Sequence, residues 1–182
     1  MFAHLRPAIT LTLFFAILTG LLYPLAITGA AQAVFPDQAN GSQVTRNGTL
    51  LGSALIGQNW TADKYFHGRP SAVKYDASTS SGSNLGPSSK TLMAGIADNA
   101  KAIGGTGIPA DLVTASGSGL DPDISPAGAL FEVARVARAR GVTEDALRQL
   151  IAAHTKGPDL GILGEQRVNV LALNLALDEL KP

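Results

Sequence analysis

The chain has 182 residues, of which 46% are hydrophobic and 15% are charged, and its 14 basic and 14 acidic side chains leave no formal net charge. This balance provides neither a basic field for nucleic acid nor an acidic tail. The absence of cysteine excludes disulfides, thiolate metal sites, catalytic thiols and lipidated cysteines.

The first predicted element is a membrane helix, because no charged side chain occurs over residues 7–36. About 20 apolar residues in a helix suffice to cross the roughly 30 Å hydrocarbon core of a bilayer. A cleaved signal peptide is the alternative, and the small-residue pattern at 31–33 supports it, but signal cores run to only about 7–15 residues. We therefore favour a retained transmembrane helix over residues 7–35.

The charges that flank this helix predict its orientation. Arg6 precedes the helix, whereas the first basic residue after it is Arg46, beyond Asp37. Positive charge tends to stay on the cytoplasmic side of a membrane. We expect a single-pass protein with a cytoplasmic N-terminus (residues 1–6) and one extracytoplasmic, periplasmic domain (residues 36–182).

Three residues, Gly20, Pro24 and Gly29, interrupt the otherwise uniform membrane helix. Pro24 removes a backbone donor and clashes one turn back, near Gly20, so we expect a kink there. A small residue also lets another membrane helix approach closely, although an anchor tolerates a few glycines in any case.

The first part of the domain is rich in Gly, Ser, Asn and Pro. Residues 50–56 predict a short strand, and residues 64–75 predict extended segments bent by Gly68 and Pro70. Residues 77–89 are mostly serine and glycine without an apolar period, which predicts a flexible loop.

The second part predicts helices with clear start and stop signals. One begins with a serine cap and a proline at 125–126 and ends at Gly141, with Leu130, Val133 and Ala137 on one apolar face and Ala129 and Val136 beside them. Residues 168–180 alternate like a strand but also fit a helix, which we favour because no β-branched residue follows Val170. The remaining expected elements are a helix from a cap at Ser88 or Ser89 to Ile103, a strand over 111–116, and a helix that opens at 143–145. Together these elements predict a helix-rich α+β domain.

Motifs for catalysis and metal binding are missing. The glycine-rich stretches 104–107 and 117–119 lack the lysine of a phosphate-binding loop. The three histidines, His4, His67 and His154, are isolated in sequence. Residues 121–132 match a calcium-loop register in part, but the sixth position is Pro126 and a helix starts there. We therefore predict no catalytic residue and no metal ligand, and turn contacts for Asp121 and Asp123.

Several stretches from the membrane helix to the C-terminus form a specific combined pattern. They are residues 19–24 (TGLLYP), 52–58 (GSALIGQ), 65–71 (YFHGRPS), 81–86 (SGSNLG), 109–126, 135–137 and 167–171 (RVNVL) leading into 173–178. In this order and spacing they resemble the C subunit of the Kdp-type potassium-transporting ATPase of bacteria.

The resemblance implies a non-catalytic accessory subunit of an ATP-driven potassium uptake complex in the bacterial inner membrane. In this family a channel-like subunit carries potassium, and a P-type ATPase subunit hydrolyses ATP through a phospho-aspartate. These two subunits are the implied partners, with a small additional membrane subunit as a further candidate. The C subunit is described as a catalytic chaperone that stabilises the assembly and raises the ATP affinity of the hydrolysing subunit. No tightly bound cofactor is implied: ATP acts through the ATPase subunit, and potassium is the transported ion.

The predicted topology constrains how such an effect on ATP could arise. ATP is hydrolysed in the cytoplasm, whereas the predicted domain lies outside. The effect must then travel through the membrane helices as a coupling between distant sites, or the domain must act at the potassium entrance.

One position departs from the family pattern. Family members usually carry Gln at the position of Glu132, which is suspected of involvement in nucleotide effects. A carboxylate repels phosphate and lacks the donors of an amide, so Glu132 and Arg135 are the less favoured candidates for such effects. We favour an exposed helix residue that pairs with Arg135 at i+3. The preferred candidates for partner contacts are Gly20, Pro24, Arg69, Ser81 and Asn84.

The competing hypothesis is a membrane-anchored or secreted periplasmic binding protein or enzyme that acts independently. It predicts activity or ligand uptake by residues 37–182 alone. The subunit hypothesis instead predicts co-purification with large multi-span partners.

Overall fold

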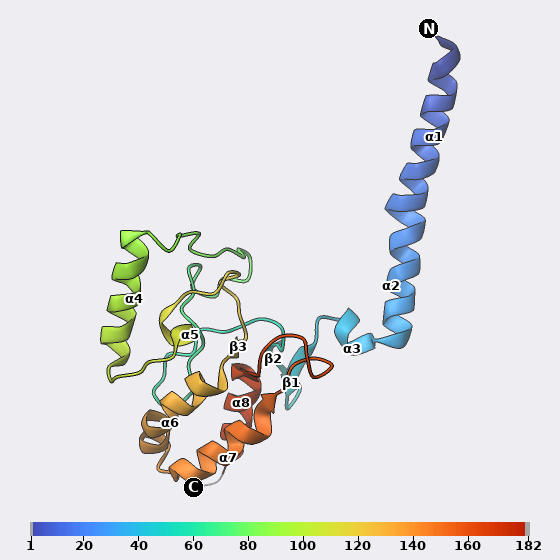
Figure 1. Ribbon diagram of the computed structural model, residues 1–182. Helices are drawn as coiled ribbons and strands as arrows, with labels where there is room; N and C mark the ends of the chain where they lie inside the picture. The colour runs from blue at the N-terminus through green and yellow to red at the C-terminus, as the bar shows by residue number, and fades with distance from the viewer. Residues whose placement is uncertain (1, 181–182) are drawn as a thin grey trace. The chain divides into compact units, whose positions relative to one another are not determined.

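The structure is a computed structural model that describes residues 2–180 (Figure 1). The chain folds as two compact units, Met1–Ser53 and Ala54–Pro182. The first carries a long apolar helix and a hairpin. The second carries the helices and the small sheet that enclose the hydrophobic core.

The first unit is built on one continuous run of helix. Its parts are a 3₁₀ turn (Phe2–His4), α1 (Leu5–Ile17), a π-helical turn (Leu18–Leu22) and α2 (Tyr23–Val34). Within the described residues, Leu5–Val34 is the one helix long and apolar enough to cross a membrane. Its 30 residues extend about 45 Å, more than a bilayer core requires. The helix expected over residues 7–35 is thus present with nearly the expected bounds.

The irregularity expected at Pro24 takes the form of this π-helical turn. Proline has no N–H and its ring crowds the carbonyl of the preceding turn. The N–H of Tyr23 donates to the carbonyl of Leu18, five residues back, which is the bond that defines a π turn. A Cβ added to Gly20 in this turn would meet nothing within 4 Å, so this side of the helix is open to another helix.

A β-hairpin completes the first unit. Its three short elements are α3 (Pro36–Ala39), β1 (Gln43–Arg46) and β2 (Thr49–Ser53), of which the strands pair antiparallel. Asn47 and Gly48 in the turn have φ values of 51° and 78°, the left-handed geometry of a tight two-residue turn. The strand expected over residues 50–56 is therefore present, but it starts one residue earlier and ends at Ser53.

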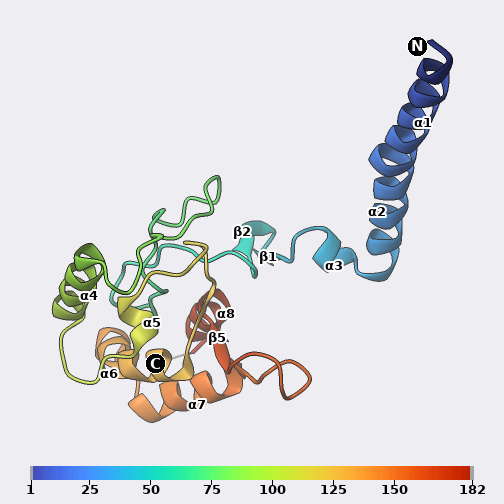
Figure 2. The ribbon, with the colours of Figure 1, turned by 45° about the horizontal axis from the view of Figure 1, so that its top comes forward.

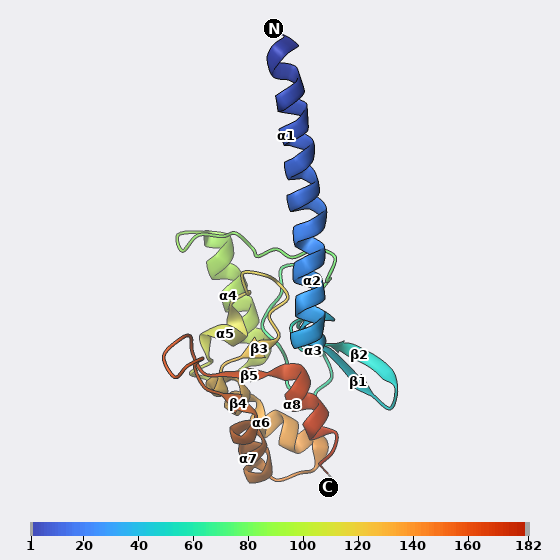
Figure 3. The same cartoon turned by 90° about the vertical axis from the view of Figure 1, so that its right-hand side faces the viewer.

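A small antiparallel sheet organises the second unit (Figure 3). Its strands, in spatial order, are β3 (Asp123–Ile124), β5 (Arg167–Asn169) and β4 (Thr155–Lys156). Asn169 fixes the central strand, because its Nδ2 donates to the carbonyl of Ala54 at 2.9 Å and to Oδ1 of Asp123 at 3.1 Å. Its Oδ1 accepts from the N–H of Ala172 and so caps the following helix. The helix expected over 168–180 consequently begins two residues late, because its start pairs as β5.

Three helices pack on this sheet and on each other: α6 (Pro126–Arg140), α7 (Glu144–His154) and α8 (Val170–Leu177). The hydroxyls of Ser125 and Thr143 cap α6 and α7 as predicted, and Gly141 ends α6 with φ 69°. The apolar face expected for α6 is confirmed at Ala129, Val133, Val136 and Ala137, which are buried, but it is wrong at Leu130, which is 39% exposed.

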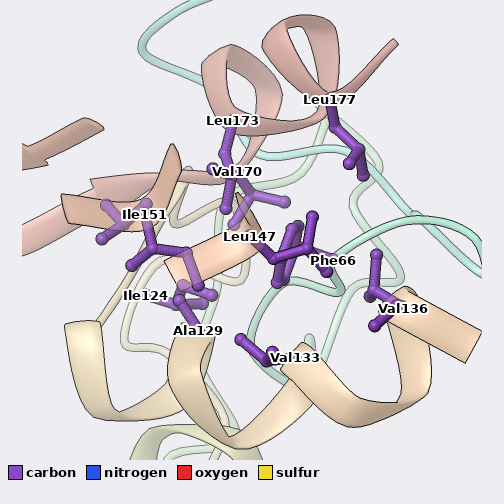
Figure 4. Close-up of a cluster of buried hydrophobic side chains, with 12 residues drawn as sticks. Phe66, Ile124, Ala129, Val133, Val136, Leu147, Ile151, Val170, Leu173 and Leu177 are labelled. Atoms are coloured by element: carbon purple, nitrogen blue, oxygen red, sulfur yellow. The ribbon is translucent and has the colours of Figure 1, made fainter. Parts of the chain in front are cut away.

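Phe66 lies at the centre of the core, although it belongs to an irregular segment (Figure 4). Its ring lies among side chains from α6, α7 and α8, and it is fully buried. Burial of one such ring contributes about 2–3 kcal/mol of transfer free energy. Residues 64–75, expected as extended segments, contain no strand. They are anchored instead by Phe66 and by side-chain hydrogen bonds.

Two further helices lie beside this core, α4 (Lys90–Ile103) and α5 (Ala110–Val113). The hydroxyl of Ser89 caps α4 and Gly104 ends it, as predicted. The strand expected over 111–116 is wrong, because this segment begins as α5 and buries Leu112 and Val113 in a helical turn. An apolar run this short has no period that separates strand from helix.

Candidate functional site

Glu132 on α6 is the one carboxylate among the predicted site residues, and it is buried. The residue is 8% exposed, and its Oε2 accepts from the backbone N–H of His67 at 2.7 Å. Its Oε1 accepts from Nη2 of Arg135 at 2.7 Å. The i+3 pair with Arg135 is thus confirmed, but the expectation of an exposed residue is wrong. The carboxylate is buried because it accepts the hydrogen bond of the His67 N–H, which has no neighbouring strand to supply an acceptor.

Arg135 also joins α6 to the irregular segment that contains His67. Its Nη1 donates to the carbonyl of Asp63 at 2.6 Å and its Nη2 to the carbonyl of Tyr65 at 3.0 Å. Charged donors bound to backbone carbonyls form the stronger class of hydrogen bond. Glu132 and Arg135 therefore fasten the irregular segment 63–67 to α6.

Arg69 forms an ion pair with Asp121, with Nη1 and Oδ2 3.1 Å apart. Asp121 also accepts through Oδ1 from the N–H of Asp123, which confirms the predicted turn contact. The carbonyl of Arg69 accepts from the hydroxyl of Tyr75 at 2.6 Å. The side chain of Arg69 thus joins the family-like segment 65–71 to the loop before α6, and its carbonyl holds the ring of Tyr75.

Close approach of two backbones explains why glycine occupies position 119. Gly119 has φ +67°, and a Cβ there would lie 2.6 Å from the carbonyl oxygen of Ser81 and 2.6 Å from Cγ2 of Val73. Its carbonyl accepts from the hydroxyl of Ser71 at 2.6 Å. Only glycine leaves room for the contacts of position 119 with Ser71, Val73 and Ser81.

The structure places Ser81 and Asn84 differently within the 77–89 segment, which has no helix or strand. Ser81 is half-buried against Gly119, whereas Asn84 is exposed with φ 54°. A left-handed Asn in irregular backbone is a turn residue that tolerates this geometry well. Flexibility of this segment stays a prediction.

A pocket of about 330 Å³ is lined by several of the residues described above. Arg69 and Glu132 line it, together with Trp60, His67 and Tyr75, whereas Ser81, Asn84 and Arg135 are not part of its lining. Among residues 2–180, Trp60 Nε1 and Arg69 Nε are buried donors without a hydrogen-bond partner. No group of three or more His, Asp or Glu residues in the described part of the chain could hold a metal ion.

Tyr75 carries the one large pKa shift of this site. Burial, reinforced by the charge of Asp121 and opposed by Arg69, raises the pKa of Tyr75 to about 12. The phenol is therefore a neutral donor to the carbonyl of Arg69 at physiological pH. No sequence pattern indicated this role, because Tyr75 ends an irregular segment that has no apolar period.

Replacing Tyr75 with Phe should remove this hydrogen bond and lower the free energy of unfolding by about 1 kcal/mol at pH 7. An unfolded tyrosine ionises near pH 10, whereas the pKa of Tyr75 in the fold is about 12. The stability that Tyr75 contributes is thus complete below about pH 10 and is lost as the pH rises through that window. Urea unfolding followed by the fluorescence of Trp60 should show a steeper loss of stability above pH 10 for the wild-type chain than for Tyr75→Phe. Equal slopes for both chains would contradict this assignment.

Comparison with known proteins identifies the family. The model of the family KdpC, described as "K+-transporting ATPase, c chain", matches residues 5–179. A potassium-transporting ATPase KdpC subunit of Gemmatimonas aurantiaca is 57% identical, over 99% of this chain and 94% of the relative. Those of Caulobacter vibrioides (56% identical, 100% of this chain and 96% of the relative) and Rhodopseudomonas palustris (52%, all of both chains) are similar over their full lengths. The chain therefore belongs to the KdpC family of potassium-transporting ATPase subunits.

Proposed function

We propose that this chain is a non-catalytic accessory subunit of an ATP-driven potassium uptake complex in the bacterial inner membrane. It stabilises the assembly and raises the ATP affinity of the P-type ATPase subunit. Its partners are that subunit, the channel-like potassium-translocating subunit and a small additional membrane subunit as a further candidate. The observation that carries the proposal is the match to KdpC subunits along the whole chain, helix Leu5–Val34 included.

Two features of the chain support an accessory role. One membrane helix cannot enclose a pore, so transport needs other chains. The charged side chains of the candidate site, such as Arg69 and Glu132, are engaged by Asp121, His67 and Arg135 in contacts that hold the fold together. Hydrolysis of ATP is accordingly assigned to a partner subunit.

The orientation that we propose has the N-terminus in the cytoplasm and the domain in the periplasm, because Arg6 precedes the helix. The effect on ATP then reaches the ATPase through the membrane helices, or the domain acts at the potassium entrance. A reporter enzyme that is active only outside the cytoplasm, fused after Pro182, tests this topology. Activity of the same reporter inside the cell would overturn it.

The proposed partner contacts divide between the two units. Gly20 lies in the π-helical turn, and Pro24 follows that turn in α2. The open side of the helix at Gly20 would receive another membrane helix. In the domain, Arg69, Ser81 and Asn84 are the proposed contacts. Asn84 is the most accessible of these three, because Arg69 and Ser81 are half-buried.

Removing this chain from the co-expressed complex should raise the ATP concentration for half-maximal hydrolysis by roughly fivefold or more, the usual size of a coupling between sites. The complex would be extracted in mild detergent, and its chains identified by mass. We expect the wild-type chain to co-purify with multi-span membrane subunits. A solitary chain with its own activity or ligand would instead favour the independent periplasmic binding protein or enzyme.

A further inference from the structure

The π-helical turn Leu18–Leu22 lies halfway along the membrane helix Leu5–Val34, which continues through the turn as one helix (Figure 2). Gly20, in the middle of the turn, is 15 residues from Leu5 and 14 from Val34. At 1.5 Å per residue each end of the helix is about 20 Å away, so in a bilayer the turn lies near the centre of the hydrocarbon core. Little water is present at that depth to bind a backbone group that lacks a partner.

The turn deprives the carbonyl of Thr19 of its usual helical donors. In an α-helix this carbonyl would accept from the N–H of Tyr23, but that N–H donates to the carbonyl of Leu18. In a π turn it would accept from residue 24, which is proline and has no N–H. The π pattern also directs the N–H of Leu22 five residues back, away from Thr19. The Thr19 carbonyl therefore needs a donor from outside these backbone groups.

The possible donors at this depth are few. A proline in a membrane helix is tolerated where a local change of helix type, a Ser or Thr side chain, ordered water or a neighbouring helix satisfies the freed backbone groups. The π turn is the change of helix type, and it is what leaves the Thr19 carbonyl open. The hydroxyl of Thr19 itself is engaged, because it donates to the carbonyl of Phe15 at 2.7 Å. A neighbouring helix is the remaining source, since water is scarce in the hydrocarbon core.

The helix surface beside this carbonyl is open to such a neighbour. A Cβ added to Gly20 would meet nothing within 4 Å, and the flanking Leu21 and Leu22 are exposed. Glycine lets a second membrane helix come close enough for its side chain to reach a main-chain carbonyl. Because Leu5–Val34 is the one candidate membrane helix of the described residues, the neighbour belongs to another chain.

We propose that the carbonyl of Thr19, beside Gly20, accepts a hydrogen bond from a side chain on a membrane helix of another subunit of the complex. The donor would be a hydroxyl or an amide, as in Ser, Thr, Asn or Gln, because a charged donor is costly at the centre of a bilayer. This inference rests on the proposed function, since it needs an assembly with other membrane helices. It goes further by naming the accepting atom and the chemistry of the partner side chain.

Two variants test the proposal by the fraction of this chain that stays bound to the complex in mild detergent. Pro24→Ala restores an N–H, so the helix can become regular and satisfy its own carbonyls while the partner's donor loses its acceptor. We expect the bound fraction to fall roughly threefold to tenfold, the usual range for a hydrogen bond between membrane helices. Gly20→Val keeps the proline but blocks the close approach, and it should lower the bound fraction at least as much.

Gly29→Val is the matched control on the same helix. A Cβ added to Gly29 would also meet nothing within 4 Å. Gly29 follows Gly20 by nine residues, about two and a half helical turns, so it lies on the opposite side of the helix. We expect Gly29→Val to stay bound as well as the wild type.

The carbonyl itself can be observed by NMR. Threonine labelled with ¹³C at its carbonyl and glycine labelled with ¹⁵N together select Thr–Gly peptide bonds, of which the sequence has three: Thr19–Gly20, Thr28–Gly29 and Thr106–Gly107. A carbonyl carbon resonates further downfield when its oxygen accepts a hydrogen bond. We expect the Thr19 signal to move downfield when the chain assembles with the other subunits, and the other two signals to stay in place.

The outcomes separate this inference from the proposed function. If the wild-type chain does not co-purify with multi-span subunits, the proposed function fails. If the wild type assembles and Pro24→Ala stays bound equally well, the inference is overturned while the proposed function stands, even if Gly20→Val is lost. A downfield Thr19 signal in the chain alone would also overturn it, showing contact between copies if the signal depends on the concentration of the chain and bound water if it does not.

Discussion

Replacing Asn174 with leucine should lower the free energy of unfolding by about 3 kcal/mol, despite the similar size of the two side chains. Asn174 is fully buried on α8. Its Oδ1 accepts from the N–H of Phe66 at 2.9 Å, and its Nδ2 donates to the carbonyl of Phe66 at 2.9 Å. The Asn174 amide thus makes the two backbone hydrogen bonds that a neighbouring strand would otherwise make to Phe66. Leucine would leave both main-chain groups of Phe66 buried without partners.

The chain contains a single tryptophan, Trp60, which packs against the core and reports on its unfolding. Urea titrations of the full chain in detergent, followed by its fluorescence, would measure the change. Asn59→Leu, at an exposed position, is the matched control and should shift the free energy by no more than about 0.5 kcal/mol. If Asn174→Leu shifted it no more than the control, the two hydrogen bonds to Phe66 would not hold the segment.

The helical spacing of α8 shows how much the sequence could predict here. The helix expected over 168–180 rested on the helical spacing of Val170, Leu173, Leu177 and Leu180, of which the first three are buried and Leu180 is partly buried. Asn174 lies on that same face and is buried with them, but its hydrogen bonds were not predicted. The partner could not be predicted, because Phe66 is 108 residues away and lies in a segment without a period.

Short segments mark the limit of prediction from sequence. Local signals are independent of distant contacts. The cap at Ser125 and the helix start at 143–145 were predicted correctly, and of the two candidates Ser88 and Ser89 it is Ser89 that caps α4. The strands β3 and β4 have two residues each, and only pairing across the chain with β5 defines them. The wrong strand over 111–116 has the same cause, because α5 is a single helical turn.

The candidate site was predicted in part for a related reason. The i+3 spacing of Glu132 and Arg135 was sufficient to predict their ion pair. Burial of Glu132 was missed, because it depends on the N–H of His67, which reaches α6 only after Phe66 enters the core. The role of Glu132 therefore follows from tertiary packing.

Replacing Glu132 with leucine should lower the free energy of unfolding by about 2 kcal/mol, because the N–H of His67 would lose its buried acceptor. Arg135 would contribute little to this loss, since its side chain is 30% exposed and keeps the carbonyls of Asp63 and Tyr65 as acceptors. Glu132→Gln, which introduces the residue that the family resemblance leads one to expect at this position, retains one acceptor oxygen and should cost only about 1 kcal/mol. Urea titrations with the fluorescence of Trp60 distinguish these two values.

The same pair of variants separates a structural role of Glu132 from a role in nucleotide effects. If the carboxylate serves only to hold residues 63–67 on α6, Glu132→Gln should leave the ATP concentration for half-maximal hydrolysis by the assembled complex within about twofold of the wild type. Leucine should reduce activity only as far as it reduces the folded, assembled fraction of the chain. A change of roughly fivefold or more with Gln, at nearly unchanged stability, would show a coupling between this position and the nucleotide site. Because the proposed topology places the two sites on opposite sides of the membrane, such a coupling would have to pass through helix Leu5–Val34 or through a partner subunit.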